Sequence, residues 1–203
     1  MKNFYYLKTD PYNFEGLPSS LFDVSYTAVK EYKHPFRQLT DIEIPPYFNS
    51  FFTDNHLLGK NEVIRANWFK LRPHGSGPIH LDGIQPLQDT WGLNWFINWK
   101  DTYMQWFKSK KEGVWYPTFN TRGGITWTEE EVELVESVEL SKPCFVNIDG
   151  PHRMMSKSDD WRFCISVRIF KTVILEDIGK SVVRTIPKEE MFERLSAQNL
   201  IES

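Results

Sequence analysis

Short runs of β-branched and aromatic residues, separated by turn-forming residues, recur along the chain from Asn61 to Phe170. The runs are EVIRANWFKLR, PIHLD, GLNWFINW, TYMQWFK, GVWYPTF, CFVNI and WRFCISVRIF. Short strands at this spacing, bounded by Gly, Pro, Asn and Asp, are typical of a β-sandwich or a β-barrel. The sequence therefore predicts a mainly β core, which we expect to cover residues 61–178.

The segments that flank this core have different patterns. Residues 1–60 mix aromatic side chains with prolines that interrupt any long helix, so we expect a packing arm with short helices near 20–32 and 46–58. A chain of 203 residues is an ordinary size for one compact domain. We therefore expect a single domain, 1–203, in which the arm packs around the β core.

Two segments in the second half of the chain have patterns that allow or favour a helix. The acids and alternating Val and Leu of TEEEVELVESVEL, residues 128–140, suit either a helix or an edge strand. Pro187 opens PKEEMFERLSAQNLIES, and a proline at the start followed by acids in the first turn predicts a C-terminal helix over 187–203.

Charge and cysteine content narrow the class of protein. The chain has 24 Lys and Arg against 27 Asp and Glu, and this net charge of −3 disfavours nucleic acid or an anionic membrane as the main partner. Cys144 and Cys164 lie in apolar runs without CxxC spacing, which indicates buried free thiols in a reducing cytosol. No signal-peptide pattern or continuous apolar span is visible, so we expect a cytoplasmic protein that does not cross a membrane.

The run at residues 161–170 has an unusual alternation. With a period of two, Arg162, Cys164, Ser166 and Arg168 project from one face of the strand, and Trp161, Phe163, Ile165, Val167 and Ile169 project from the other. One face is apolar and the other carries two cations. The cationic face therefore either meets solvent or lines a polar cavity.

A candidate metal site comes from His80, Asp82 and His152. His80 and Asp82 are two residues apart, so on a strand both side chains leave the same face, and His152 follows 70 residues after Asp82 at the end of CFVNIDGPH. Two imidazoles and one carboxylate form a facial triad that leaves three positions open on a metal such as Fe(II). This ligand set favours iron, manganese or zinc over magnesium or calcium. A surface loop pair, or a His–Asp hydrogen bond without metal, is the alternative for His80 and Asp82.

A cation and an amide accompany these residues. Arg162 follows His152 by ten residues, on the polar face of the next strand, where its guanidinium can clamp a carboxylate through two parallel hydrogen bonds. Arg168 shares that face and is the rival for this role, and pairing of Arg162 with a surface aspartate is a further alternative. Asn94 interrupts the apolar run GLNWFINW, where it either contacts a cosubstrate or substrate or lies in a turn or at the edge of a ladder.

These motifs together resemble a known enzyme superfamily. HLDG at 80–83, PH at 151–152 and RFCISVRI at 162–169 look like the pattern of the Fe(II)/2-oxoglutarate-dependent oxygenases. The run from Asn147 to Ile169 also resembles the distal-histidine segment of the aspartyl/asparaginyl β-hydroxylase-like branch, although well-known members of that branch lack a carboxylate at the position of Asp82. Many members of the superfamily carry Ser or Thr where this chain has Cys164.

The resemblance implies a double-stranded β-helix, that is, a jelly-roll or cupin-like barrel with a few flanking helices. It implies Fe(II) at His80, Asp82 and His152, 2-oxoglutarate held by Arg162, and dioxygen as the second cosubstrate. The reaction would be oxidation, usually hydroxylation, of a small-molecule or peptide substrate that no motif names. Three other classes stay open: a cupin-like metalloenzyme without 2-oxoglutarate, a noncatalytic 2-oxoglutarate-binding or metal-binding module, and a structural barrel without metal.

Overall fold

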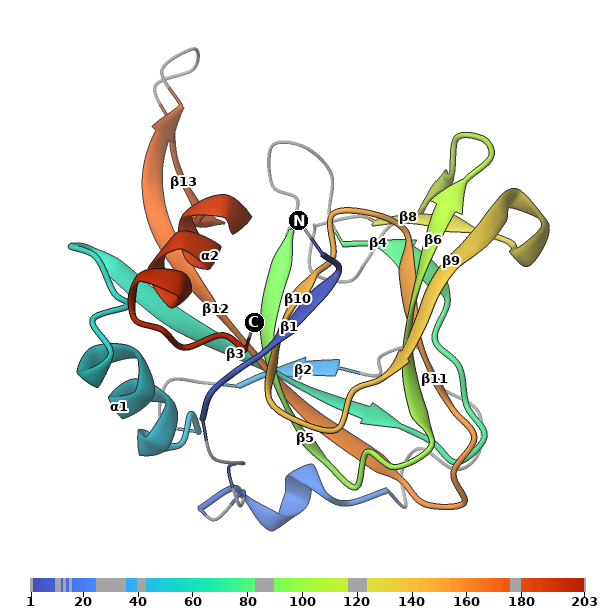
Figure 1. The fold of residues 1–203 in the computed structure, drawn as a ribbon, viewed down its shortest axis with the longest axis horizontal. Coiled ribbons are helices and arrows are strands. Elements are labelled where there is room, and N and C mark those ends of the chain that lie inside the picture. Colours follow the sequence, from blue (N-terminus) through green and yellow to red (C-terminus); the bar gives the residue numbers. More distant parts are fainter. Residues whose placement is uncertain are drawn as a thin grey trace.

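A computed structural model of the chain consists mainly of two antiparallel β-sheets that face each other (Figure 1). It describes residues 2–9, 12, 14, 16–24, 36–39, 43–82, 90–116, 124–175 and 180–202. The expectation of a mainly β fold is thus confirmed. The β-rich runs form strands because their side chains alternate between two environments, one on each face of a sheet.

The first sheet has the strand order β1-β10-β5-β12-β3-β2, and β13 pairs with the far part of β12. In chain order its strands are β1 (Phe4–Tyr6), β2 (Phe36–Gln38), β3 (Glu62–Leu71), β5 (Trp91–Ile97), β10 (Cys144–Asn147), β12 (Arg162–Leu175) and β13 (Lys180–Thr185).

The second sheet has the order β7-β8-β4-β11-β6-β9. Its strands are β4 (Ile79–Leu81), β6 (Thr102–Ser109), β7 (Val114–Tyr116), β8 (Gly124–Trp127), β9 (Val132–Glu139) and β11 (His152–Ser156). From β3 to β6, and again from β9 to β12, successive strands alternate between the two sheets. Residues far apart in sequence therefore become neighbours in space.

Two helices cover the outer face of the first sheet. Helix α1 (Pro46–Asp54) and helix α2 (Lys188–Ala197) lie on the same side of the molecule, at the left in Figure 1. Each begins directly after a proline, Pro45 or Pro187, whose restricted φ suits the start of a helix. Their apolar side chains join the main hydrophobic core, which includes Phe48, Phe52, Trp68, Leu93, Trp95, Ile165, Val167, Met191 and Leu195.

The space between the sheets contains a second apolar cluster and a polar region. Cys144, Val146 and Cys164 from the first sheet pack against Met104 and Trp106 from the second. The alternation expected at 161–170 is confirmed, because Ile165 and Val167 enter the main core while Cys164 faces the other sheet. Since Arg162, Ser166 and Arg168 are also buried, the cationic face lines the interior and does not face open solvent.

Other expectations are refined by the structure. Residues 128–140 form a short 3-10 turn, Glu129–Glu131, followed by the edge strand β9, so the strand alternative is correct. The C-terminal helix is shorter than expected, because it ends at Ala197 and Ile201 then forms a bridge with Leu7. The N-terminal arm contributes β1, β2 and α1, while most of the helix expected near 20–32 lies outside the described residues.

Both cysteines are buried and free, as expected, and burial raises the pKa of each thiol. Within the described ranges, no helix combines the length and the apolarity that a membrane span requires.

Candidate metal centre

His80 and His152 are directly opposite each other on neighbouring strands of the second sheet. His80 lies in the middle of β4 and His152 begins β11, and the two residues form the registered pair of this antiparallel ladder. Side chains that are directly opposite in an antiparallel pair project from the same face. The two imidazole rings accordingly lie with their centroids 4.5 Å apart.

Backbone carbonyls orient both imidazoles in the same way. His80 Nδ1 lies 3.0 Å from the carbonyl oxygen of Pro78, and His152 Nδ1 lies 2.9 Å from that of Gly150. Because a carbonyl oxygen only accepts hydrogen bonds, each Nδ1 carries the proton. The Nε2 lone pair of a neutral ring is then available to a metal, as in the supporting contacts of metal-bound histidines.

Asp82 completes the cluster directly after the end of β4. Its Oδ1 is 3.2 Å from His80 Nε2, and the ligand atoms of His80, Asp82 and His152 all lie within 4.8 Å of one another. Bonds of about 2.1 Å to a metal hold ligand atoms at most about 4 Å apart, so a small rotation of the side chains suffices to close the site. The three residues fit a mononuclear metal with two nitrogen ligands and one oxygen ligand.

The protonation states of His152 and Asp82 agree with this donor set, whereas His80, whose Nε2 donates to Asp82, has to release a proton to bind a metal. Burial and the neighbouring charge of His80 lower the pKa of His152 to about 4, so its ring is neutral near pH 7. Burial opposes ionisation of Asp82, but its hydrogen bond with His80 outweighs burial and lowers the pKa of Asp82 well below its ordinary value. The same hydrogen bond, against the effect of burial, raises the pKa of His80. A neutral imidazole and an ionised carboxylate are the forms that bind metal.

Arg168 is the cation that the structure brings to the triad. Its Nη2 lies 3.5 Å from Asp82 Oδ2, and its Nε donates a 2.8 Å hydrogen bond to the carbonyl oxygen of Trp91 on β5. The side chain is buried. A second anionic group bound beside Asp82 would therefore also lie within reach of this guanidinium.

Polar side chains line the same interior face next to Arg168. Asn94 on β5, Ser166 on β12 and Asn67 on β3 form one row across the three strands. Asn94 is buried inside β5 rather than in a turn, and its Oδ1 has no hydrogen-bond partner among the described residues. A Cβ on Gly92 would meet Ser166 Oγ at 2.8 Å and Asn94 Oδ1 at 3.2 Å, so this row of polar groups depends on a glycine.

Arg162 lies elsewhere on the same face. Its Nε and Nη2 donate hydrogen bonds of 3.2 and 3.1 Å to the carbonyl oxygen of Lys100, and its Nη1 is 3.9 Å from Asp160. It lines a separate pocket of about 310 Å³. Six residues of strand place Arg162 roughly 20 Å from Arg168 along β12. The structure thus brings Arg168 to the triad but not Arg162, whose role as a clamp stays a prediction.

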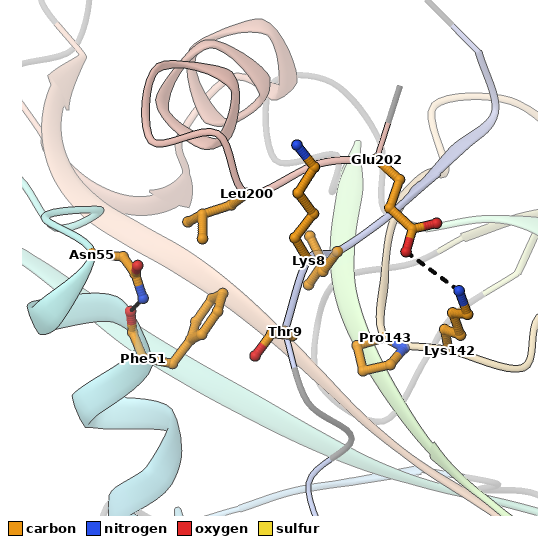
Figure 2. Close-up of a pocket in the computed structure, with 9 residues that line it drawn as sticks. Lys8, Thr9, Phe51, Asn55, Lys142, Pro143, Leu200 and Glu202 are labelled. Atoms are coloured by element: carbon orange, nitrogen blue, oxygen red, sulfur yellow. Dashed lines mark hydrogen bonds and ion pairs between the residues drawn. The ribbon is translucent and has the colours of Figure 1, made fainter.

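A larger pocket of about 540 Å³ lies between the two ends of the chain (Figure 2). It is lined by residues from the N-terminal segment, α1, the β9–β10 connection and the C-terminal segment, including Lys8, Phe51, Lys142, Leu200 and Glu202. No triad residue lines it. Lys8 is bonded to Asn199 and Lys142 is paired with Glu202, so the two cations of this pocket already have partners.

Arg65 and Asn67, which belong to none of the sequence motifs, face the same interior as Arg168 and Ser166. The signal for them was present in EVIRANWFKLR, where Val63, Arg65, Asn67 and Phe69 alternate with the apolar residues of β3. A period of two says that these side chains share a face, but not which strand lies opposite them.

No protein-family model matches the chain, and a search of curated proteins finds no match.

Proposed function

We propose that the chain is a non-heme Fe(II)- and 2-oxoglutarate-dependent oxygenase, most simply a hydroxylase. The observation that carries the proposal is the convergence of His80, Asp82 and His152, with Nδ1 of each imidazole held by a backbone carbonyl so that Nε2 is left for the metal. Two histidines and one carboxylate leave three positions of an octahedral metal open, enough for a bidentate cosubstrate and dioxygen.

The proposed fold is a double-stranded β-helix. Two four-stranded units, β10-β5-β12-β3 and β9-β6-β11-β4, belong to facing sheets, and successive strands alternate between them. This connectivity supports a jelly-roll barrel, in which the inner faces of both sheets surround one interior site. His80 belongs to β4 and His152 to β11 of the second sheet, Asp82 directly follows β4, and Arg168 comes from β12 of the first sheet.

In this proposal each side chain has a defined task. Fe(II), 2-oxoglutarate and dioxygen, when bound, supply oxidative decarboxylation coupled to oxidation of the substrate. His80, Asp82 and His152 hold the metal, and the carbonyls of Pro78 and Gly150 fix the imidazoles.

The interior face of the first sheet would hold the cosubstrate. Arg168 offers charged N–H donors to a carboxylate next to Asp82, and Asn94 and Ser166 add neutral polar groups beside it. The apolar cluster of Met104, Trp106 and Cys164 keeps water from the interior between the sheets.

Anaerobic titration of the protein with Fe(II) and 2-oxoglutarate tests the proposal. We expect a visible charge-transfer band that requires both components, followed in air by release of succinate. A well-folded protein that shows no such band would refute the proposal. A band without succinate release, even with a broad panel of substrates, would point to a noncatalytic 2-oxoglutarate-binding module.

A cupin-like metalloenzyme that does not use 2-oxoglutarate is the second candidate. It is favoured by the position of Arg162, whose contacts are Lys100, Trp161 and Asp160 rather than any triad residue. Such an enzyme would bind Fe(II), Mn(II) or Zn(II) at the triad, and 2-oxoglutarate would change neither the metal affinity nor the spectrum.

A further inference from the structure

Two arginines lie side by side on the inner face of the first sheet. Arg65 of β3 is directly opposite Arg168 of β12, so both side chains project toward the side of the metal centre. Like charges in this arrangement repel each other and destabilise the strand pair. Asp82 offsets the charge of Arg168 at 3.5 Å.

Arg65 has no such partner in the described part of the chain. Its guanidinium carbon lies 4.8 Å from the centre of the Phe170 ring, and no described carboxylate is within ion-pair distance. Arg65 is half-buried, unlike Arg168. A partly accessible guanidinium beside a second cation is a ready site for an anion, because a bound carboxylate or phosphate relieves the repulsion and accepts two hydrogen bonds.

An apolar wall continues from this pair toward solvent. Val63 is opposite Phe170 in the next same-face pair, and Ile174 lies on the same face of β12 beyond the exposed Thr172. Val63 is 53% exposed and Ile174 is 68% exposed. The β12–β13 hairpin that carries Ile174 projects beyond the rest of the sheet, at the upper left in Figure 1.

We propose that Arg65 binds an anionic group of the substrate and that Val63 and Ile174 cover the apolar body of the same molecule. The substrate class is therefore a small organic anion with an apolar chain or ring. This inference rests on the proposed function, since it assumes that the triad is the reacting centre. The strand from Arg168 to Ile174 measures roughly 20 Å, which limits the apolar body to that length.

The cosubstrate alone does not account for this wall. 2-Oxoglutarate is a short diacid with no apolar body to cover Val63 and Ile174. Arg168, within 3.5 Å of Asp82, is the better placed of the two arginines for a metal-bound acid. We therefore assign Arg65 to a second anion, which is distinct from the cosubstrate.

Calorimetric titration of metal-free protein with decanoate, decanol and butanoate tests the inference without requiring an active enzyme. We expect decanoate to bind more tightly than decanol, because only the carboxylate meets Arg65. Arg65→Gln should weaken decanoate binding about 10- to 100-fold, as expected for loss of a charged hydrogen bond, while Arg65→Lys retains part of the affinity. Ile174→Asn should weaken decanoate binding but leave butanoate binding unchanged.

Lys60→Gln is the matched control, since it removes one exposed positive charge from the turn before β3. Unchanged decanoate affinity in Arg65→Gln, or equal affinity for decanol and decanoate, would overturn the inference. If Arg65→Gln instead weakens 2-oxoglutarate binding to the Fe(II) protein, Arg65 belongs to the cosubstrate site and the inference is also wrong. Decanoate binding without a charge-transfer band would refute the proposed oxygenase and leave the anion site standing.

Discussion

His80 and His152 form a registered pair on two adjacent antiparallel strands, and their rings lie 4.5 Å apart although 72 residues separate them in the chain. Each ring is held through Nδ1 by the carbonyl two residues before it. The pair is therefore a rigid two-nitrogen donor set, built on strands and not on loops. A metal needs only the Asp82 carboxylate to complete three protein ligands.

Removing the Asp82 carboxylate should weaken metal binding. Asp82→Ala takes away the oxygen ligand, and we expect Mn(II) or Zn(II) affinity to fall by more than the roughly 10- to 100-fold that follows loss of a supporting group. Calorimetric titration with either metal measures this. Asp159→Ala is the matched control, because Asp159 also pairs with a histidine, His74, at 2.8 Å on the surface. Equal metal affinity in both variants would mean that Asp82 is not a ligand.

The two arginines of β12 should differ in their effect on 2-oxoglutarate. Arg168→Gln removes the guanidinium beside Asp82, so we expect the 2-oxoglutarate affinity of the Fe(II) protein to drop about 10- to 100-fold. Arg162→Gln should have the smaller effect, because Arg162 is bonded to the carbonyls of Lys100 and Trp161. Titration followed by the charge-transfer band compares them, and the opposite order would assign the clamp to Arg162.

Gly92→Ala should destabilise the interior of the first sheet. The added Cβ meets Ser166 Oγ at 2.8 Å, and overpacking of this kind costs about 1–3 kcal/mol of unfolding free energy. Urea denaturation measures the loss. Gly77→Ala, whose Cβ would make only ordinary contacts, is the control. In a Ser166→Ala background the cost of Gly92→Ala should shrink, and an unchanged cost would show that Ser166 Oγ is not the obstacle.

Acid should weaken the attachment of α2 to the first sheet. Glu62 accepts hydrogen bonds from Arg194 at 2.5 and 2.9 Å, and these bonds hold the pKa of Glu62 below its ordinary value. A depressed pKa in the folded state stabilises the protein above the pKa of the unfolded chain, and this contribution is lost as the pH falls through the folded pKa.

Glu62→Gln should therefore lower the free energy of unfolding at pH 7 by about 1.5–3 kcal/mol. The difference from the unsubstituted protein should diminish once the pH falls below about 4.3, the ordinary pKa of a glutamate. Urea denaturation at pH 7 and pH 3 provides the comparison. A difference that is the same at both pH values would show that the charge of Glu62 does not contribute.

Local patterns in the sequence determined which residues form strands and which side chains share a face. The alternation at 161–170 predicted that Arg162 and Arg168 share one face, and the spacing of His80 and Asp82 predicted that their side chains lie on the same side, because a strand repeats every two residues. Whether the face with the two arginines is buried stayed open in the sequence. Pro187 likewise predicted the start of α2. Each of these inferences depends only on neighbours in the chain.

Tertiary structure alone decided which strands lie opposite each other. The pairing of His80 with His152, the placement of Arg168 rather than Arg162 beside Asp82, and the juxtaposition of Arg65 with Arg168 all depend on register between strands distant in sequence. Within residues 128–140, the segment β9 is an edge strand because it pairs with β6 in an antiparallel ladder. The register between two strands is set by the packing of both sheets at once. Several registers keep the apolar face of a strand inside, and the alternation with a period of two is the same in all of them, so the sequence pattern does not select one.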